Sequence, residues 1–171
     1  MRDSTKGEHP RLIIPFYDIN NKVFAFQGRA FGKEQPKYLT VKLDENKQKV
    51  YGLDTVNLQE HIHIVEGPID IMFVKNCLAA AGADLTLKVE PNNVTYIFDN
   101  EPRNKEIIKR MYDVIEKDYN LVVWPEILNK HKDINDMIIA GIDKIKLHEI
   151  ISTNTCSKLE ALTRLTDWKK I

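Results

Sequence analysis

From residue 61 onward, short apolar runs alternate with longer segments of helical character, and this alternation restricts the fold more than any other feature. The runs HIHIV at 61–65, NVTYIF at 93–98 and NLVVW at 120–124 are rich in β-branched and aromatic residues, which favours strands. In RNKEIIKRMYDVIEKD at 103–118, the apolar residues recur at helical spacing. Strands that alternate with helices predict an α/β fold in which helices flank a mainly parallel sheet.

Further elements are expected around these runs. The segment IDIMFVKNCLAAAG at 69–82 is apolar on nearly all sides, so it predicts a largely buried helix that begins near Pro68 and stops at Gly82. The other expected elements are a short strand at 85–89, short helices at 133–141 and 142–151, and a C-terminal helix within 152–171.

The segment 11–58 has a different character, because it is mostly strand and turn. Two β-rich runs surround the turn Asp18–Asn21 and predict a hairpin, and PKYLTVKL at 36–43 predicts another strand. We therefore expect three parts: a small basic strand-rich subdomain at 1–58, an α/β domain at 59–145 and a helical extension at 146–171.

Charge is unevenly distributed along the chain, although the formal net charge is zero. Residues 1–58 carry ten lysines and arginines against seven acidic residues, whereas residues 59–145 carry ten against fifteen. A basic flank beside an acidic centre would suit a protein that holds polyanions in one place and cations in another. Ordinary scatter of surface charge would produce the same distribution, and it is the simpler interpretation of charge alone.

Several classes of protein are excluded or disfavoured by the sequence. No apolar stretch approaches the ~20 residues that a membrane-spanning helix needs, and the N-terminal MRDSTKGEHP lacks the apolar core of a secretory signal. The two cysteines, Cys77 and Cys156, are far apart and form no CxxC pair, so neither a zinc site nor a disulfide framework is predicted. A reducing, cytoplasmic location is expected.

Acidic side chains follow three of the predicted strands or their loops. Glu66 follows HIHIV, Asp99 and Glu101 follow TYIF, and Asp133 follows the loop after NLVVW. In open parallel sheets, functional groups gather beyond the carboxyl ends of the strands. Carboxylates that converge there would repel one another unless cations lay among them, and Mg²⁺ prefers such oxygen ligands.

A simpler interpretation stays open at this point. Acidic residues after strands often cap the next helix or face solvent, and Glu66, Asp70, Glu126 and Asp136 could each do no more than that. Asp99 and Glu101 are harder to explain in this way, because the pattern D-x-E follows a fully apolar strand and precedes a basic helix start.

The order of the acidic motifs resembles a known family. VEGPID at 65–70, FDNE at 98–101 and KDIND at 132–136 together resemble the Toprim domain, the metal-binding catalytic fold of bacterial-type primases, topoisomerases and some nucleases. The preceding segments, RLIIPFYDINNKVFAFQGRAF, PKYLT and VYGL, resemble the basic subdomain that comes before Toprim in bacterial and phage DNA primases. The resemblance covers about residues 11–140.

This resemblance implies roles for particular residues. The catalytic residues that it implies are Glu66, Asp99 and Glu101. The ligands of Mg²⁺ or Mn²⁺ would be Glu66, Asp70, Asp99, Glu101 and Asp133. The contacts to template or nucleotide phosphates would be Arg29, Lys37, Tyr38 and Lys132. The motif departs from the usual Asp-x-Asp, because Glu101 takes the place of the second aspartate.

The function that the resemblance implies is synthesis of short RNA primers from NTPs on a single-stranded DNA template. A replicative helicase or a zinc-binding module would assist in trans or lie in another part of the protein. If the chain is phage-encoded, it would act in the host cytoplasm. Two alternatives stay open: a Toprim nuclease or phosphodiesterase, and a non-catalytic nucleic-acid-binding module of a replisome.

Overall fold

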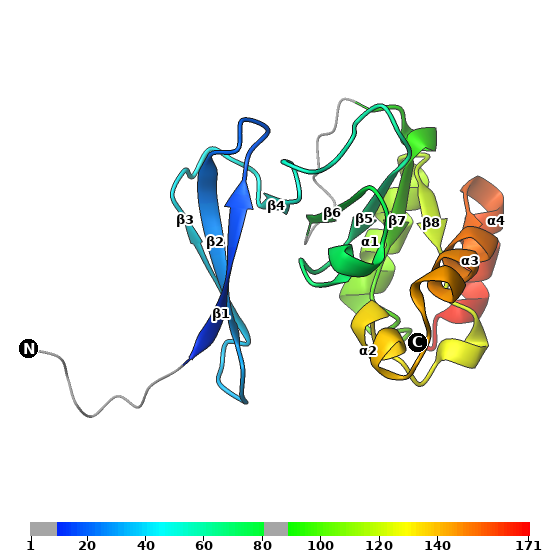
Figure 1. The fold of residues 1–171 in the computed structure, drawn as a ribbon. Coiled ribbons are helices and arrows are strands. Elements are labelled where there is room, and N and C mark those ends of the chain that lie inside the picture. The colour runs from blue at the N-terminus through cyan, green and yellow to red at the C-terminus, as the bar shows by residue number, and fades with distance from the viewer. Residues whose placement is uncertain (1–9, 81–88) are drawn as a thin grey trace, which may run out of the picture. The chain divides into compact units, whose positions relative to one another are not determined.

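The computed structural model describes residues 10–80 and 89–171, and the chain divides into two compact units, Met1–Lys49 and Val50–Ile171 (Figure 1). Each unit has its own β-sheet, so each is described by itself. The boundaries that we predicted after residues 58 and 145 stay predictions.

The first unit is a three-stranded antiparallel sheet with the order β1-β2-β3. Its strands are β1 (Arg11–Tyr17), β2 (Val23–Ala30) and β3 (Tyr38–Lys42). The sheet confirms the expected hairpin and the third strand of the strand-rich segment.

The hairpin turn between β1 and β2 is held by the carboxylate of Asp18. This carboxylate accepts the backbone N–H groups of Asn20 and Lys22, each at 2.9 Å, while Asn21 adopts a left-handed backbone with φ 58°. Asparagine tolerates that conformation better than most residues, which explains why the turn reads D-I-N-N. A hydrogen-bonded ion pair with Lys47 is the main cause that lowers the pKa of Asp18 to about 2.

The second unit contains a six-stranded sheet with the order β4-β6-β5-β7-β8-β9. The four inner strands are parallel, and the two outer strands run antiparallel to their neighbours. This arrangement confirms the predicted mainly parallel α/β sheet. The strands are β4 (Val50–Tyr51), β5 (Ile62–Val65), β6 (Cys77–Ala80), β7 (Val94–Ile97), β8 (Asn120–Val122) and β9 (Thr155–Cys156).

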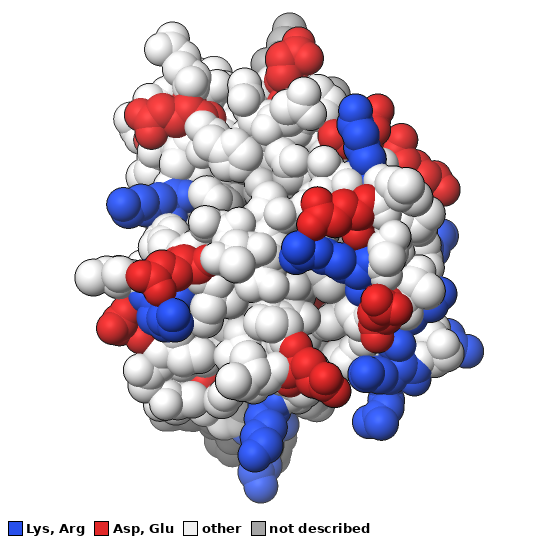
Figure 2. Space-filling view, turned by 90° about the vertical axis from the view of Figure 1, so that its right-hand side faces the viewer, with Lys and Arg blue, Asp and Glu red and all other residues white. Residues whose placement is uncertain are grey.

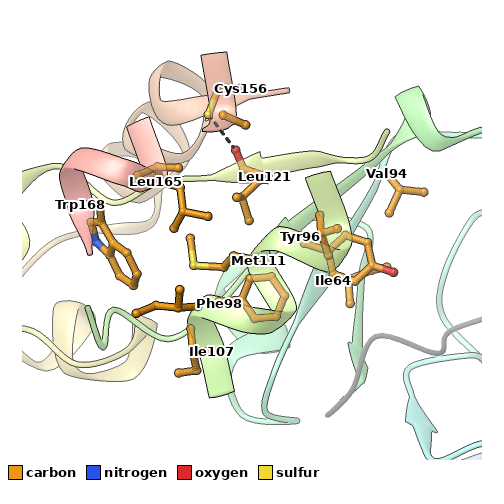
Figure 3. Close-up of a cluster of buried hydrophobic side chains, with 14 of the residues drawn as sticks. Ile64, Val94, Tyr96, Phe98, Ile107, Met111, Leu121, Cys156, Leu165 and Trp168 are labelled. Atoms are coloured by element: carbon orange, nitrogen blue, oxygen red, sulfur yellow. Dashed lines mark hydrogen bonds between the residues drawn. The ribbon is translucent and has the colours of Figure 1, made fainter. Parts of the chain in front are cut away.

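Helices cover both faces of this sheet. On one face, α1 (Lys105–Glu116) and α4 (Lys158–Trp168) bury their apolar side chains against β5, β7 and β8, as Figure 3 shows. On the other face, α2 (Ile134–Ile139) and α3 (Lys144–Asn154) pack over a second apolar cluster. The described part of this unit also contains three short 3-10 helices: η1 (Asp70–Phe73), η2 (Pro91–Asn93) and η3 (Glu126–Leu128).

Helix α1 begins where its sequence provides a cap. The side chain of Asn104 accepts the backbone N–H groups of Glu106 and Ile107, which have no partner within the helix. In its apolar stripe, Ile107, Ile108, Met111 and Val114 are buried and Ile115 is partly buried. The helices predicted at 133–141, at 142–151 and in the C-terminal segment are also confirmed, as α2, α3 and α4.

The predicted buried helix at 69–82 is wrong. Only the single 3-10 turn η1 forms, starting two residues after Pro68, and the chain then becomes strand β6. Strand β6 is hydrogen-bonded to strands on both of its sides, so the run CLAA is apolar on both faces, a pattern that periodicity cannot distinguish from a buried helix. Gly82 and most of the strand predicted at 85–89 lie outside the described residues.

Cys77 is buried, and it lies in strand β6 and not in the helix predicted for this segment. Within residues 10–80 and 89–171, none of the helices combines the length and the apolar composition that crossing a bilayer requires.

Asn76 separates η1 from β6, and it should contribute to stability both by conformation and by hydrogen bonds. Its φ is 42°, and its side chain bonds the backbone of Asn57 and the carbonyl of His61 at 2.8–2.9 Å. We expect Asn76→Ala to lower the free energy of unfolding by about 1–3 kcal/mol.

Asn76→Gly should lose less, because glycine removes the hydrogen bonds but not the left-handed backbone. Urea unfolding of both variants, with the exposed Asn92→Ala as control, checks this. Equal stability of the alanine variant and the unsubstituted chain would contradict it.

Candidate active site at the carboxyl ends of the parallel strands

Strands β5 and β7 are parallel neighbours, and their pairing brings two of the predicted acidic residues together. In their register Val65 lies opposite Ile97, so Glu66 and Asp99 leave the sheet at the same edge. The backbone N–H of Asp99 donates to Oε2 of Glu66 at 3.0 Å. The sheet topology therefore joins residues that are 33 positions apart in the sequence.

The other carboxylate oxygen of Glu66 forms an ion pair with Arg110 of α1. The two side chains are only 16% and 18% exposed, and the Arg110 guanidinium lies over the ring of Phe98 at 5.3 Å. Sequence reasoning did not identify Arg110. A signal was present, since a charged residue three positions after Ile107 borders the apolar stripe and so faces the sheet.

Gly67 lies between Glu66 and Asp70, and it leaves room for the second acid. A side chain at Gly67 would bring its Cβ within 2.9 Å of Oδ2 of Asp70. The Asp70 carboxylate accepts backbone hydrogen bonds from Gly67 and Asn135, so it ties the start of η1 to α2. Burial, followed by the charge of Asp133, raises the pKa of Asp70 to about 6.

The pKa of Asp99 is raised by its burial and by nearby acidic side chains. Burial is the main cause that raises the pKa of Asp99 to about 7; the negative charges of Glu66, Asp70 and Asp133 contribute to this rise in that order, and the charge of Lys132 opposes it. A carboxyl group whose ionisation is opposed by three neighbouring acids indicates that these side chains converge on one region.

Glu101 is already paired with a cation. Nζ of Lys132 lies 2.8 Å from one oxygen of Glu101, and Nδ2 of Asn104 donates to the other oxygen at 3.0 Å. The Lys132 hydrogen bond is the main cause that lowers the pKa of Glu101, and the same bond raises the pKa of Lys132.

Asp133 has the capping role that the simpler interpretation gives to acids after strands. Its side chain accepts the backbone N–H of Asp136 at 2.8 Å and so begins α2. The same carboxylate adds its charge to the field at Asp70 and Asp99. Asp133 can therefore cap helix α2 and also belong to the group of converging acids.

The acidic group fits a hard divalent cation in its chemistry. In the described part of the chain, no three histidine, cysteine, aspartate or glutamate side chains are already arranged to hold a metal ion. Asp70 and Asp99, however, carry oxygen donors whose charge is opposed by neighbouring acids, and a bound cation would relieve that cost. Glu66 and Glu101 would first have to leave Arg110 and Lys132.

A groove of about 480 Å³ borders Glu101, and it is lined by Glu101, Pro102, Arg103, Asn104 and Asn129.

On the face of the molecule shown in Figure 2, lysines and arginines are interspersed with acidic residues, with uncharged surface between them.

Three of the four predicted phosphate contacts gather in the first unit. Arg29 lies opposite Tyr38 in the β2–β3 register, with its guanidinium 6.0 Å from the centre of the tyrosine ring, and Nζ of Lys37 is 5.7 Å from the same centre. Cations held over an exposed aromatic ring could contact both the phosphates and the bases of a nucleic acid. The fourth residue, Lys132, lies in the second unit beside Glu101.

Comparison of the sequence with curated proteins found DNA primases. The chain is 37% identical to the DNA primase of enterobacteria phage T4 over 166 residues, which are 95% of this chain and 48% of that protein. It is 28% identical to the DNA primase of Clostridium acetobutylicum over 124 residues, 63% of this chain and 21% of that protein. The chain thus spans less than half the length of these relatives. No protein-family model matches.

Comparison with solved structures found the same fold in primase catalytic cores. The zinc-binding and RNA polymerase domains of the Aquifex aeolicus primase match with a TM-score of 0.66 and 21% identity, covering 97% of this chain and 48% of that one. The E. coli primase catalytic core matches with a TM-score of 0.63 and 19% identity, covering 90% of this chain and 56% of that one. Both comparisons confirm the resemblance expected from the motifs.

The raised pKa of Asp99 predicts a change in stability with pH. Because its folded-state pKa of about 7 exceeds the ordinary 3.8, its contribution is fully present below pH 3.8 and is lost as the pH rises through 7. Without divalent ions, Asp99→Asn should therefore raise the free energy of unfolding at pH 8 by on the order of 1–3 kcal/mol.

The difference should shrink toward pH 4, where Asp99 is protonated in the folded chain. Urea unfolding in EDTA at both pH values measures it, and Asp54→Asn, which changes an exposed acid of the same unit, should have no such effect. A destabilised Asp99→Asn variant at pH 8 would show that the acids do not repel one another.

Proposed function

Because the chain is similar to the DNA primase of phage T4 over 95% of its length, we propose that it is the catalytic core of a DNA primase. Its reaction would be nucleotidyl transfer, the synthesis of short RNA primers from NTPs on single-stranded DNA. The observation that carries this proposal is the convergence of Glu66, Asp70, Asp99 and Asp133 in a chain with that similarity.

In this proposal Asp99, Asp70 and Asp133 would hold Mg²⁺ or Mn²⁺, and Glu101 would join them once Lys132 had moved away. When bound, the cation would supply positive charge next to the α-phosphate and the attacking 3′ hydroxyl. Glu66 serves as the general base for that hydroxyl. The Asp99 N–H and Arg110 fix the direction in which the Glu66 carboxylate points.

Lys132 would act on the nucleotide. Its side chain is 57% exposed, so it can turn from Glu101 to the phosphates of an incoming NTP and offset the charge that develops as pyrophosphate leaves. This exchange would release the Glu101 carboxylate at the moment when a cation–nucleotide complex arrives.

The first unit would hold the template strand through Arg29, Lys37 and Tyr38. One of the structures with the same fold is described as a primase catalytic domain bound to single-stranded DNA; it matches with a TM-score of 0.62 and 18% identity. A stacking ring flanked by two cations is suited to a strand without strong sequence preference.

Partners follow from the proposed activity. The Aquifex aeolicus structure includes a zinc-binding domain, and we propose that a module of that kind, together with a replicative helicase, directs this core to its template. The similarity to a phage primase supports a phage origin and action in the host cytoplasm.

A non-catalytic role as a nucleic-acid-binding module is the second candidate. It is favoured by the two ion pairs, because Arg110 and Lys132 already neutralise Glu66 and Glu101 without any metal. Only an activity measurement separates the two roles.

Removal of the proposed base should abolish synthesis without abolishing DNA binding. We expect Glu66→Gln and Asp99→Asn to lower the rate of primer formation by about 10²- to 10⁴-fold, since each removes a group that would act in the reaction. The assay contains single-stranded DNA, labelled NTPs and Mg²⁺ or Mn²⁺. Glu116→Gln, at the exposed end of α1, is the matched control.

Binding without turnover in the unsubstituted chain would favour the non-catalytic module. Strand cleavage that depends on Glu66 would favour the nuclease. Full primer synthesis by Glu66→Gln would exclude the proposed role of that residue.

If Lys37 and Tyr38 contact the template, changing either residue should weaken the binding of single-stranded DNA, and the two changes should differ in how the loss depends on salt. Lys37→Ala should weaken binding of single-stranded DNA and reduce the slope of log affinity against log salt by about 0.7. Tyr38→Leu should weaken binding by about 1–3 kcal/mol at every salt concentration, because a stacking surface is lost. Fluorescence anisotropy at several salt concentrations measures both effects.

Lys22→Ala removes a cation at the other end of the sheet, in the β1–β2 turn, and serves as control. If it changes the salt slope as much as Lys37→Ala does, the unit binds by general charge alone.

A further inference from the structure

Asn100, between the two acids of the D-x-E motif, points into the protein and not toward the site. It is 4% exposed and has partners for its backbone N–H and for its whole side-chain amide. The amide donates to the carbonyls of Leu128 and His131 at 2.9 and 3.0 Å, and the backbone N–H donates to the carbonyl of Lys132 at 2.6 Å. One buried residue thus holds the loop 128–132 at three points.

This loop carries two residues of the proposed site. Lys132, its last residue, pairs with Glu101, and Asp133 follows at once as the cap of α2. The hydrogen bonds of Asn100 therefore set how far Asp99 and Glu101 lie from the consecutive residues Lys132 and Asp133.

Helix α4 completes the arrangement from the far end of the chain. Nε1 of Trp168, a side chain that is 6% exposed, donates to Oδ1 of Asn100 at 3.1 Å. Two residues later, the backbone N–H of Lys170 donates to the carbonyl of Pro102 at 2.8 Å. Figure 3 shows Trp168 on the same side of the sheet as Phe98, Ile107 and Leu165.

We infer that Asn100 is a positioning residue for the active site and that Trp168 holds it in place, so that the end of α4 belongs to the catalytic scaffold. This inference rests on the proposed function. Loss of either residue should leave the acids present but release the loop that carries Lys132 and Asp133. An amide is required at position 100, because it donates twice to the loop while accepting once from the indole.

The test compares the unsubstituted chain with its Asn100→Ala and Trp168→Phe variants. Trp168→Phe keeps a large ring but removes the N–H donor. Val94→Ala is the control for stability, because Val94 is fully buried at the opposite end of β7 from Asp99. Hydrogen exchange of residues 128–133 is measured without metal or substrate, and kcat and KM for NTP are measured below the unfolding temperatures of all variants.

We expect faster exchange of the loop in Asn100→Ala and Trp168→Phe, and a fall in kcat of about 10- to 100-fold for Asn100→Ala, with a smaller fall for Trp168→Phe. Val94→Ala should lower the unfolding temperature without changing either quantity. Unchanged loop exchange in Asn100→Ala would overturn the inference, as would a fall in kcat for Val94→Ala equal to that for Asn100→Ala. Faster exchange in a chain that makes no primers would support the scaffold and count against the proposed function instead.

Discussion

The convergence of partly buried carboxylates is the constraint on which the rest of this site depends. The parallel pairing of β5 with β7 forces Glu66 and Asp99 to one edge of the sheet, and η1 and α2 add Asp70 and Asp133. Burial, with added repulsion from these neighbouring acids, raises the pKa of Asp99 to about 7. At neutral pH such a group is stabilised either by a bound proton or by nearby positive charge.

The chain supplies part of that charge from its own residues. Arg110 pairs with Glu66 and Lys132 pairs with Glu101, so two acids are balanced while Asp70 and Asp99 are not. Arg110 is enclosed against Phe98, whereas Lys132 is largely exposed. We interpret the first pair as a fixed support and the second as an exchangeable one, a difference that suits a site which has to admit a cation and a triphosphate.

Much of the fold and the acidic positions could be predicted because they depend on local signals. The alternation of strands and helices and the apolar stripe of α1 each need only neighbouring residues to be recognised. The segment around β6 could not be predicted in this way. Its apolar run suits a buried helix and a buried strand equally, and the partners that decide for the strand, β4 and β5, are brought beside it only by the complete sheet.

The sequence by itself determined which acidic residues follow which strands and in what order, because strand ends and helix caps are set by nearby side chains. Only the tertiary structure decided which of those acids lie close enough to raise the pKa of one another, and which of them form ion pairs with arginine or lysine. It also decided that Asn100 turns inward to bind a loop and the indole of Trp168, 68 positions away. The physical reason is that burial, ion pairing and hydrogen bonding depend on distances between residues remote in sequence, and these distances exist only once the sheet and its covering helices have formed.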